Sequence, residues 1–121
     1  MPPVLQVAIG GAIGAALRYL AGAGIARLAA PGFPVAILAV NVIGSFAMGM
    51  LAAALARAAP HLAPLLLTGV LGGFTTFSAF SLETVQLIEE GRTGGAALYV
   101  ALSVGLSVGA LALGLALGRA A

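Results

Sequence analysis

Polar side chains that could do chemistry stand at intervals within the long apolar stretches of this 121-residue chain. Because a polar residue inside a membrane is costly, each one marks a candidate functional position. The candidates are Arg18, Asn41, Ser45, Thr68, Thr75, Thr76, Ser78, Ser81, Glu83, Thr84, Gln86, Tyr99, Ser103 and Ser107. Almost all are uncharged hydrogen-bond donors, and Glu83 is the one carboxylate placed to relay protons within a span. The set favours a small-ion pathway and gives little support to proton-coupled transport.

The hydroxyls of Tyr99, Ser103 and Ser107 recur every four residues, which places them along one face of a helix. Such a line could form a track for an ion. Alternatively, each serine bonds back to the carbonyl four residues earlier and merely tolerates lipid. The spacing leaves both interpretations open.

Phenylalanines recur every three residues at Phe74, Phe77 and Phe80, and hydroxyl residues are interleaved with them. Rings at helical spacing are most often packing residues. Their edges carry partial positive charge, however, so they could also meet an anion. Because hydroxyls interleave the rings, this helix has no purely apolar side.

Two further residues have both a structural and a functional interpretation. Asn41 offers two N–H donors and one acceptor, which could hold neighbouring helices together or face an anion. Arg18 could snorkel towards the interface or have a fixed structural or electrostatic role. Hydroxyls, an amide and ring edges could replace the water around a small anion without trapping it. These residues indicate a small-ion pathway and do not select the ion.

The elements that carry these residues are membrane helices, because 62% of the chain is hydrophobic and 7% is charged. A span needs about 20 apolar residues, so the length allows four. We expect an all-α membrane protein, one domain over residues 1–121, with helices at 4–26, 34–55, 62–88 and 95–117. Five scattered arginines form no basic stripe, so nucleic acid is not an expected partner. With no cysteine and only His61, the chain has little for metal or acid–base catalysis, and no enzyme is expected.

The third span is predicted to be a broken helix at mid-membrane depth, where Gly72 and Gly73 precede a run of hydroxyl residues. Carbonyls exposed by such a break suit a cation. Four spans place both chain ends on one side, and that side then holds Arg57 and Arg119 while the opposite side holds Arg27 and Arg92. Such a balance would allow insertion in both orientations, so an antiparallel dimer would be available.

Three blocks of sequence resemble the signature of the CrcB/Fluc fluoride channels. They are residues 10–19 (GGAIGAALRY), residues 41–46 (NVIGSF) and residues 69–83 (GVLGGFTTFSAFSLE). The third block is long and specific, and the three occur in the family's order. Ala79 departs from the threonine or serine that relatives often carry, which puts a minor contact in doubt.

The resemblance implies a passive fluoride channel in a prokaryotic cell membrane, built as an antiparallel, dual-topology homodimer with two pores. It implies that Asn41 lines the pore and that Phe77 and Phe80 face the ion, supplied by the partner's third helix. The polar track would comprise Thr76, Ser81, Glu83, Tyr99, Ser103 and Ser107. Carbonyls of Gly72 and Thr75 from both subunits would hold one structural sodium ion, and Arg18 would match the family's structural arginine.

The main alternative is a small multidrug transporter, which is also short, four-spanning and antiparallel. Such transporters use a membrane-buried glutamate in the first helix, and residues 4–26 contain no acid. A purely structural membrane subunit would leave the polar residues unexplained.

Overall fold

Four long apolar helices make up the computed structural model, which describes residues 1–29 and 32–120. The first and second spans are α1 (Pro3–Leu28) and α2 (Val35–Ala58). The third span, Pro60–Glu89, combines η1 (Pro60–Leu62), η2 (Pro64–Leu71), α3 (Gly72–Phe74) and α4 (Ser78–Glu89). The fourth span is α5 (Thr93–Ala120). Each span is long enough to cross a bilayer, so the expected four-span, all-helical architecture is confirmed.

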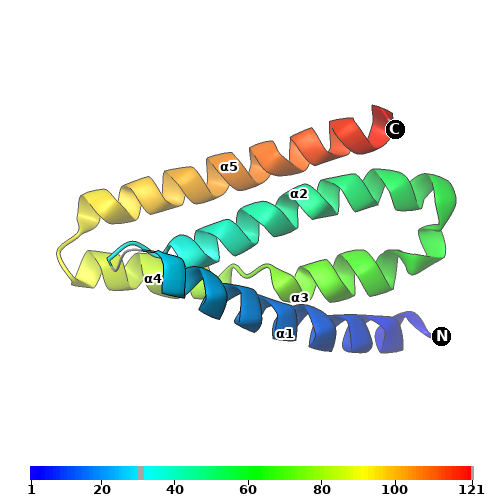
Figure 1. Cartoon of the computed structure of the whole chain (residues 1–121), viewed down its shortest axis with the longest axis horizontal. Coiled ribbons are helices and arrows are strands. Elements are labelled where there is room, and N and C mark those ends of the chain that lie inside the picture. The colour runs from blue at the N-terminus through cyan, green and yellow to red at the C-terminus, as the bar shows by residue number, and fades with distance from the viewer. Residues whose placement is uncertain (30–31, 121) are drawn as a thin grey trace.

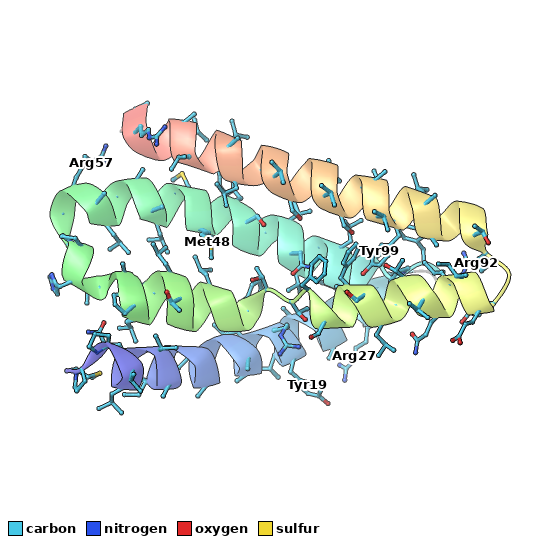
Figure 2. All side chains as sticks on the ribbon, turned by 180° about the vertical axis from the view of Figure 1, so that it is seen from behind. Tyr19, Arg27, Met48, Arg57, Arg92 and Tyr99 are labelled. Atoms are coloured by element: carbon cyan, nitrogen blue, oxygen red, sulfur yellow. The ribbon has the colours of Figure 1, made fainter. Side chains whose placement is uncertain are left out.

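The four spans lie side by side with both chain ends at the same end of the bundle (Figure 1). α5 packs most extensively against α2, and α1 packs against η2 and α3 of the third span. Arg57 and Arg92 lie at opposite ends of the bundle (Figure 2). The apolar side chains that project outwards, such as Leu28 and Val4, are suited to contact with lipid.

The third span bends where α3 ends and α4 begins, at residues 75–77. The predicted break at Gly72 and Gly73 is wrong in position, because both residues are helical and the non-helical residues begin at Thr75. Thr75 has an extended backbone with φ −85° and ψ 160°, which ends α3. The eight residues of η2 before it form a π-helix, which the sequence pattern did not indicate.

Glycines bring α1 into backbone contact with the third span. A Cβ atom added at Gly10 would lie 2.9 Å from the Cα of Gly69, and one added at Gly73 would lie 2.8 Å from the carbonyl oxygen of Gly11. Added at Gly14, a Cβ would clash with the carbonyl of Val70. Close approach of this kind is how small residues drive helix association in lipid.

Gly105 and Gly109 share the four-residue spacing of Gly10 and Gly14 but differ in their surroundings. An added Cβ at either position would meet nothing within 4 Å among the residues that the structure describes. Instead, α5 packs on α2 through Gly114 and Gly118. Two glycine pairs with the same spacing therefore differ in structure, since the pair on α1 contacts another helix and the pair on α5 contacts none in the described chain.

Replacement of Gly14 by alanine tests the importance of this backbone contact. We expect Gly14→Ala to lower the free energy of unfolding by about 1–3 kcal/mol, the usual cost of overpacking. Alanine is the better helix former, so propensity alone predicts the opposite sign. Thermal unfolding in detergent measures the difference.

The control is Gly22→Ala on the same helix, where an added Cβ meets nothing within 4 Å of the described chain. Its stability should equal or exceed that of the parent. Equal stability of the Gly14 and Gly22 variants would contradict the close packing of α1 on the third span.

Candidate functional site

A groove of about 270 Å³ runs between α2, the bend of the third span and α5. Its lining brings together six of the nine predicted pore residues, which are Asn41, Thr76, Phe77, Phe80, Ser103 and Ser107. Thr75, predicted as a cation ligand, also lines it. The remaining pore candidates, Ser81, Glu83 and Tyr99, lie outside this lining. Residues that are distant in sequence therefore converge on the bend.

Asn41 pairs with the backbone of the bend. Its Nδ2 donates to the carbonyl oxygen of Thr76 at 2.9 Å, and its Oδ1 accepts from the Thr76 amide at 2.8 Å. Thr76 lies between α3 and α4, and both of its backbone groups are thus hydrogen-bonded to one side chain. The structure realises the helix-joining interpretation of Asn41, while the same side chain also faces the groove.

Most hydroxyls of the third span serve local structure. Thr75, Ser81 and Thr84 each donate to the carbonyl oxygen four residues earlier, at 3.0, 2.9 and 2.8 Å respectively. The hydroxyl of Thr76 accepts from the amide of Ala79 at 3.1 Å, at the start of α4. These groups satisfy themselves within the span, as serine and threonine often do in membrane helices.

The hydroxyls of α5 behave differently. Those of Ser103 and Ser107 are buried and have no hydrogen-bond partner within the described residues. The Tyr99 hydroxyl is also buried, but it lies beside the carboxylate of Glu83. The interpretation that each serine bonds back to its own helix is therefore wrong for Ser103 and Ser107. A buried hydroxyl without a partner is costly, so the two serine hydroxyls, one turn apart on α5, call for a ligand.

Aromatic rings flank this line. The ring of Phe77 is 76% exposed, whereas Phe80 is 8% exposed and packs against Tyr99 with centroids 5.1 Å apart. The rings of Phe77 and Phe80 lie 5.4 Å apart and are tilted by 56°. Phe80 thus fits the packing interpretation within this chain, while Phe77 projects from it.

Phe33 is a further ring near the site, and no pattern in the sequence indicates it. Its ring and that of Tyr99 pack edge to face, with centroids 5.6 Å apart and an interplanar angle of 88°. Tyr99 is fully buried between Phe33 and Phe80 and projects from α5 into the bundle (Figure 2). Phe33 lies just before α2, outside any periodic pattern, so the sequence offered no signal for its contact.

Glu83 opens onto a second cavity of about 260 Å³ at the end of the bundle that holds the α4–α5 turn. Phe33, Gln86 and Glu90 also line it. One carboxylate oxygen of Glu83 is buried, and the carboxylate lies beside the hydroxyl of Tyr99. Beside this cavity the guanidinium of Arg92 donates to the carbonyl of Gly32. Glu83 and Tyr99 thus belong to a polar region that continues beyond the groove.

Arg18 reaches the bend from the opposite side. Its Nε donates to the carbonyl oxygen of Gly73 at 3.1 Å in a partly buried contact. This contact anchors the side chain to the third span, which favours the fixed structural interpretation over snorkelling.

The backbone carbonyls around the bend are only partly satisfied. The carbonyl of Leu71 accepts from Thr75, that of Gly73 from Arg18, and that of Thr76 from Asn41. The amides one turn beyond Gly72, those of Thr75 and Thr76, bond to Leu71 and Asn41 and so leave the Gly72 carbonyl without them. The carbonyl of Thr75, which lies outside the helices, accepts no backbone hydrogen bond within residues 1–29 and 32–120. The same residues contain no cluster of His, Cys, Asp or Glu that could hold a metal ion. Any cation at the bend would therefore need carbonyl ligands, and free carbonyls are present there.

Comparison with known proteins identifies the family. The family model described as CrcB-like protein, Camphor Resistance (CrcB), matches residues 5–115. A protein of Roseobacter denitrificans named fluoride-specific ion channel FluC is 60% identical over 106 residues, covering 85% of this chain and 84% of that protein. Proteins of the same name from Cereibacter sphaeroides and Agrobacterium fabrum are 58% and 52% identical, covering 83% of this chain and 81% and 82% of their own lengths. The chain therefore belongs to the CrcB family.

Proposed function

We propose that this chain is a fluoride-selective channel that passively exports fluoride across a prokaryotic plasma membrane and protects the cell from fluoride toxicity. The observation that carries the proposal is the pair of buried, unpartnered hydroxyls of Ser103 and Ser107 at a groove lined by aromatic rings. The relatives named as fluoride-specific channels, at up to 60% identity, support the choice of ion. The four apolar spans support a multi-pass location in the membrane.

The groove suits a small anion that must lose its water. The hydroxyls of Ser103 and Ser107 have unused donors, which could replace water around the anion. The projecting edge of Phe77 adds partial positive charge without a formal charge that would trap the ion. Passage needs neither ATP nor a coupled ion, and no bond is made or broken, so the proposed activity is transport and not catalysis.

The working unit that we propose is an antiparallel, dual-topology homodimer. The groove is open in the single chain, and the ring of Phe77 is three-quarters exposed at its edge, which supports coverage by a second copy. The balance of arginines between the two sides also supports insertion in both orientations. In such a dimer the second copy would supply the missing wall of each groove, and rings of its third span would add to the pore contacts made by one chain.

We further propose one structural sodium ion where the two bends meet. Sodium is a hard cation that takes oxygen ligands, and the unpartnered carbonyls of Gly72 and Thr75 fit that chemistry. Two chains would supply four carbonyl oxygens. The ion would hold the subunits together and would take no part in the passage of fluoride.

Nothing specific favours the alternative of a multidrug transporter. Such a protein would need an acidic residue in the first span, and α1 has none in its sequence. Its binding site would also be expected to accommodate a large organic cation, whereas the unpartnered groups here are small hydroxyls.

Fluoride efflux from liposomes tests the proposed function. Purified chain in liposomes loaded with potassium fluoride should release fluoride when valinomycin balances the charge. Liposomes loaded with potassium chloride should release no chloride under the same conditions. Release that depended on a proton gradient and an organic cation would favour the transporter, and no release of either anion would overturn the channel.

Removal of one unpartnered hydroxyl tests whether it contacts the passing ion or stabilises the fold. We expect Ser103→Ala to be as stable as the parent or more stable by about 1 kcal/mol, because a buried unpaired group is lost. Fluoride efflux should fall about tenfold, equivalent to about 1.4 kcal/mol in the barrier. Thermal unfolding and efflux are measured on the same preparation.

Thr84→Val is the matched control, because it removes a hydroxyl whose hydrogen bond is made within its own helix. Its efflux should match that of the parent. A Ser103→Ala variant that unfolds more readily and conducts normally would show that this hydroxyl has a structural role.

A further inference from the structure

Arg18 is an ionised side chain far from either end of a membrane helix. It lies ten residues before the end of α1, which is about 15 Å along the axis at 1.5 Å per residue. An arginine at such depth is costly and is usually retained for a partner that it alone can serve. The partner here is a backbone carbonyl, that of Gly73, at 3.1 Å.

The packing of α1 brings Arg18 to the end of α3. Gly11 and Gly14 contact the backbone of Gly73 and Phe74 directly. Arg18 follows Gly11 and Gly14 at helical spacing, so it continues the same face of α1 by one turn. Its guanidinium therefore meets the carboxyl end of α3, where helical carbonyls have no intrahelical donor and carry partial negative charge.

Arg18 and Asn41 hold the bend from two different helices. Arg18 binds the carbonyl of Gly73 from α1, and Asn41 binds both backbone groups of Thr76 from α2. The carbonyl of Gly72 comes directly before the first anchor and that of Thr75 directly before the second, and neither accepts a backbone hydrogen bond from residues 75–77. The anchors thus satisfy the neighbouring carbonyls and leave these two available.

We infer that Arg18 is a positioning residue, which caps α3 at Gly73 and thereby fixes the carbonyls of Gly72 and Thr75 towards a bound cation. This role rests on the sodium site of the proposed function. Arg18 contacts neither the cation nor fluoride in this arrangement. It acts through the peptide backbone, so its removal should loosen the bend before it alters the pore itself.

The experiment uses the full chain with Arg18→Gln, Arg18→Lys and the control Arg27→Gln. Arg27 lies on the same helix but is exposed near its end, so it tests the effect of losing a positive charge from α1. Two measurements are made on each variant: hydrogen exchange of the backbone amides of residues 73–79, and the sodium concentration at which thermal stability of the assembled protein is half-maximally raised. Choline replaces sodium to keep ionic strength constant.

We expect Arg18→Gln to raise exchange at the bend at least tenfold and to raise the half-maximal sodium concentration at least tenfold. Arg18→Lys should lie between Arg18→Gln and the parent, because an ammonium can still donate to the Gly73 carbonyl but has no planar fork. Arg27→Gln should match the parent in both measurements. If Arg18→Gln does not assemble, the change in amide exchange and in half-maximal sodium concentration of Arg18→Lys tests the same role of Arg18.

Unchanged exchange and unchanged sodium dependence in Arg18→Gln or Arg18→Lys would overturn the inference. If the thermal stability of the parent protein did not depend on sodium, both the proposed cation site and this role of Arg18 would be overturned. Loss of fluoride efflux from the parent, with sodium dependence intact, would instead overturn the proposed conduction and leave the role of Arg18 standing.

Discussion

Asn41→Ala is expected to reduce fluoride efflux by about two orders of magnitude, equivalent to about 2.7 kcal/mol in the barrier. The substitution removes the partner of both the amide and the carbonyl of Thr76. The bend would then lose the anchor that orients Thr76, and the groove would lose the amide that faces it. The free energy of unfolding should also fall by about 1–3 kcal/mol, because partly buried backbone groups are left unpaired. Efflux and thermal unfolding are compared at equal protein content.

Two variants show which function of Asn41 matters. Asn41→Asp keeps an acceptor for the Thr76 amide but loses the donor to the Thr76 carbonyl and adds negative charge beside an anion path. It should conduct as poorly as Asn41→Ala while losing less stability. Ile43→Ala, on the outward face of α2, should conduct normally. Normal efflux from a folded Asn41→Ala protein would contradict both the pore role and the anchoring of the bend.

The number and type of spans could be predicted because apolar length alone decides them. A lipid-exposed backbone must satisfy its own hydrogen bonds, so four apolar runs can only be four helices in this chain. The ends of the helices were predicted less accurately, since α5 extends from Thr93 to Ala120, beyond the predicted 95–117. Terminal turns at the interface need no apolar residues, so hydropathy does not mark where they stop.

The bend shows what residue types cannot determine. Gly72 and Gly73 are poor helix formers, yet both remain helical, because α1 packs closely over this stretch and Gly73 fits against Gly11. The chain leaves the helix only at Thr75, where Asn41 and Arg18 supply partners to the neighbouring peptides. Those partners lie 35 and 55 residues away in the sequence, so local propensity could not reveal them.

The hydroxyls illustrate the same limit. Ser81 and Ser103 are both serines within apolar spans, yet Ser81 bonds to its own helix and Ser103 does not. Whether a serine bonds back depends on its rotamer, which neighbouring helices fix. The spacing of the α5 hydroxyls predicted that they share a face, and only the packed structure distinguishes a line of unpartnered donors from self-satisfied ones.

Gly72 and Gly73 are adjacent but differ in what surrounds them, and this difference gives a prediction about assembly. A Cβ added at Gly72 would meet only the carbonyl oxygen of Leu67 within 4 Å in the described chain. Their separation would be 3.5 Å, an ordinary van der Waals contact. A Cβ at Gly73 would lie 2.8 Å from the Gly11 carbonyl oxygen. One protomer thus requires glycine at position 73 and leaves room at position 72.

We therefore expect Gly72→Leu to yield a folded, helical protomer that fails to dimerise and conducts no fluoride. In the proposed dimer the two bends meet, so a large side chain there would separate the carbonyls that hold sodium. Gly73→Ala should instead destabilise the protomer itself, by about 1–3 kcal/mol from overpacking. Circular dichroism reports the fold, cross-linking in liposomes reports the dimer, and efflux reports conduction.

Thr75→Ser is the conservative comparison at the same site. It keeps the proposed carbonyl ligand and the hydroxyl that donates to Leu71, and it loses only the methyl group that packs over Gly44. Dimer and efflux should therefore stay close to those of the parent. If Gly72→Leu formed a stable dimer whose melting still depended on sodium, the bends could not meet at a shared carbonyl site. A Thr75→Ser protein without a dimer would show instead that the side chain, and not the carbonyl, is what the assembly needs.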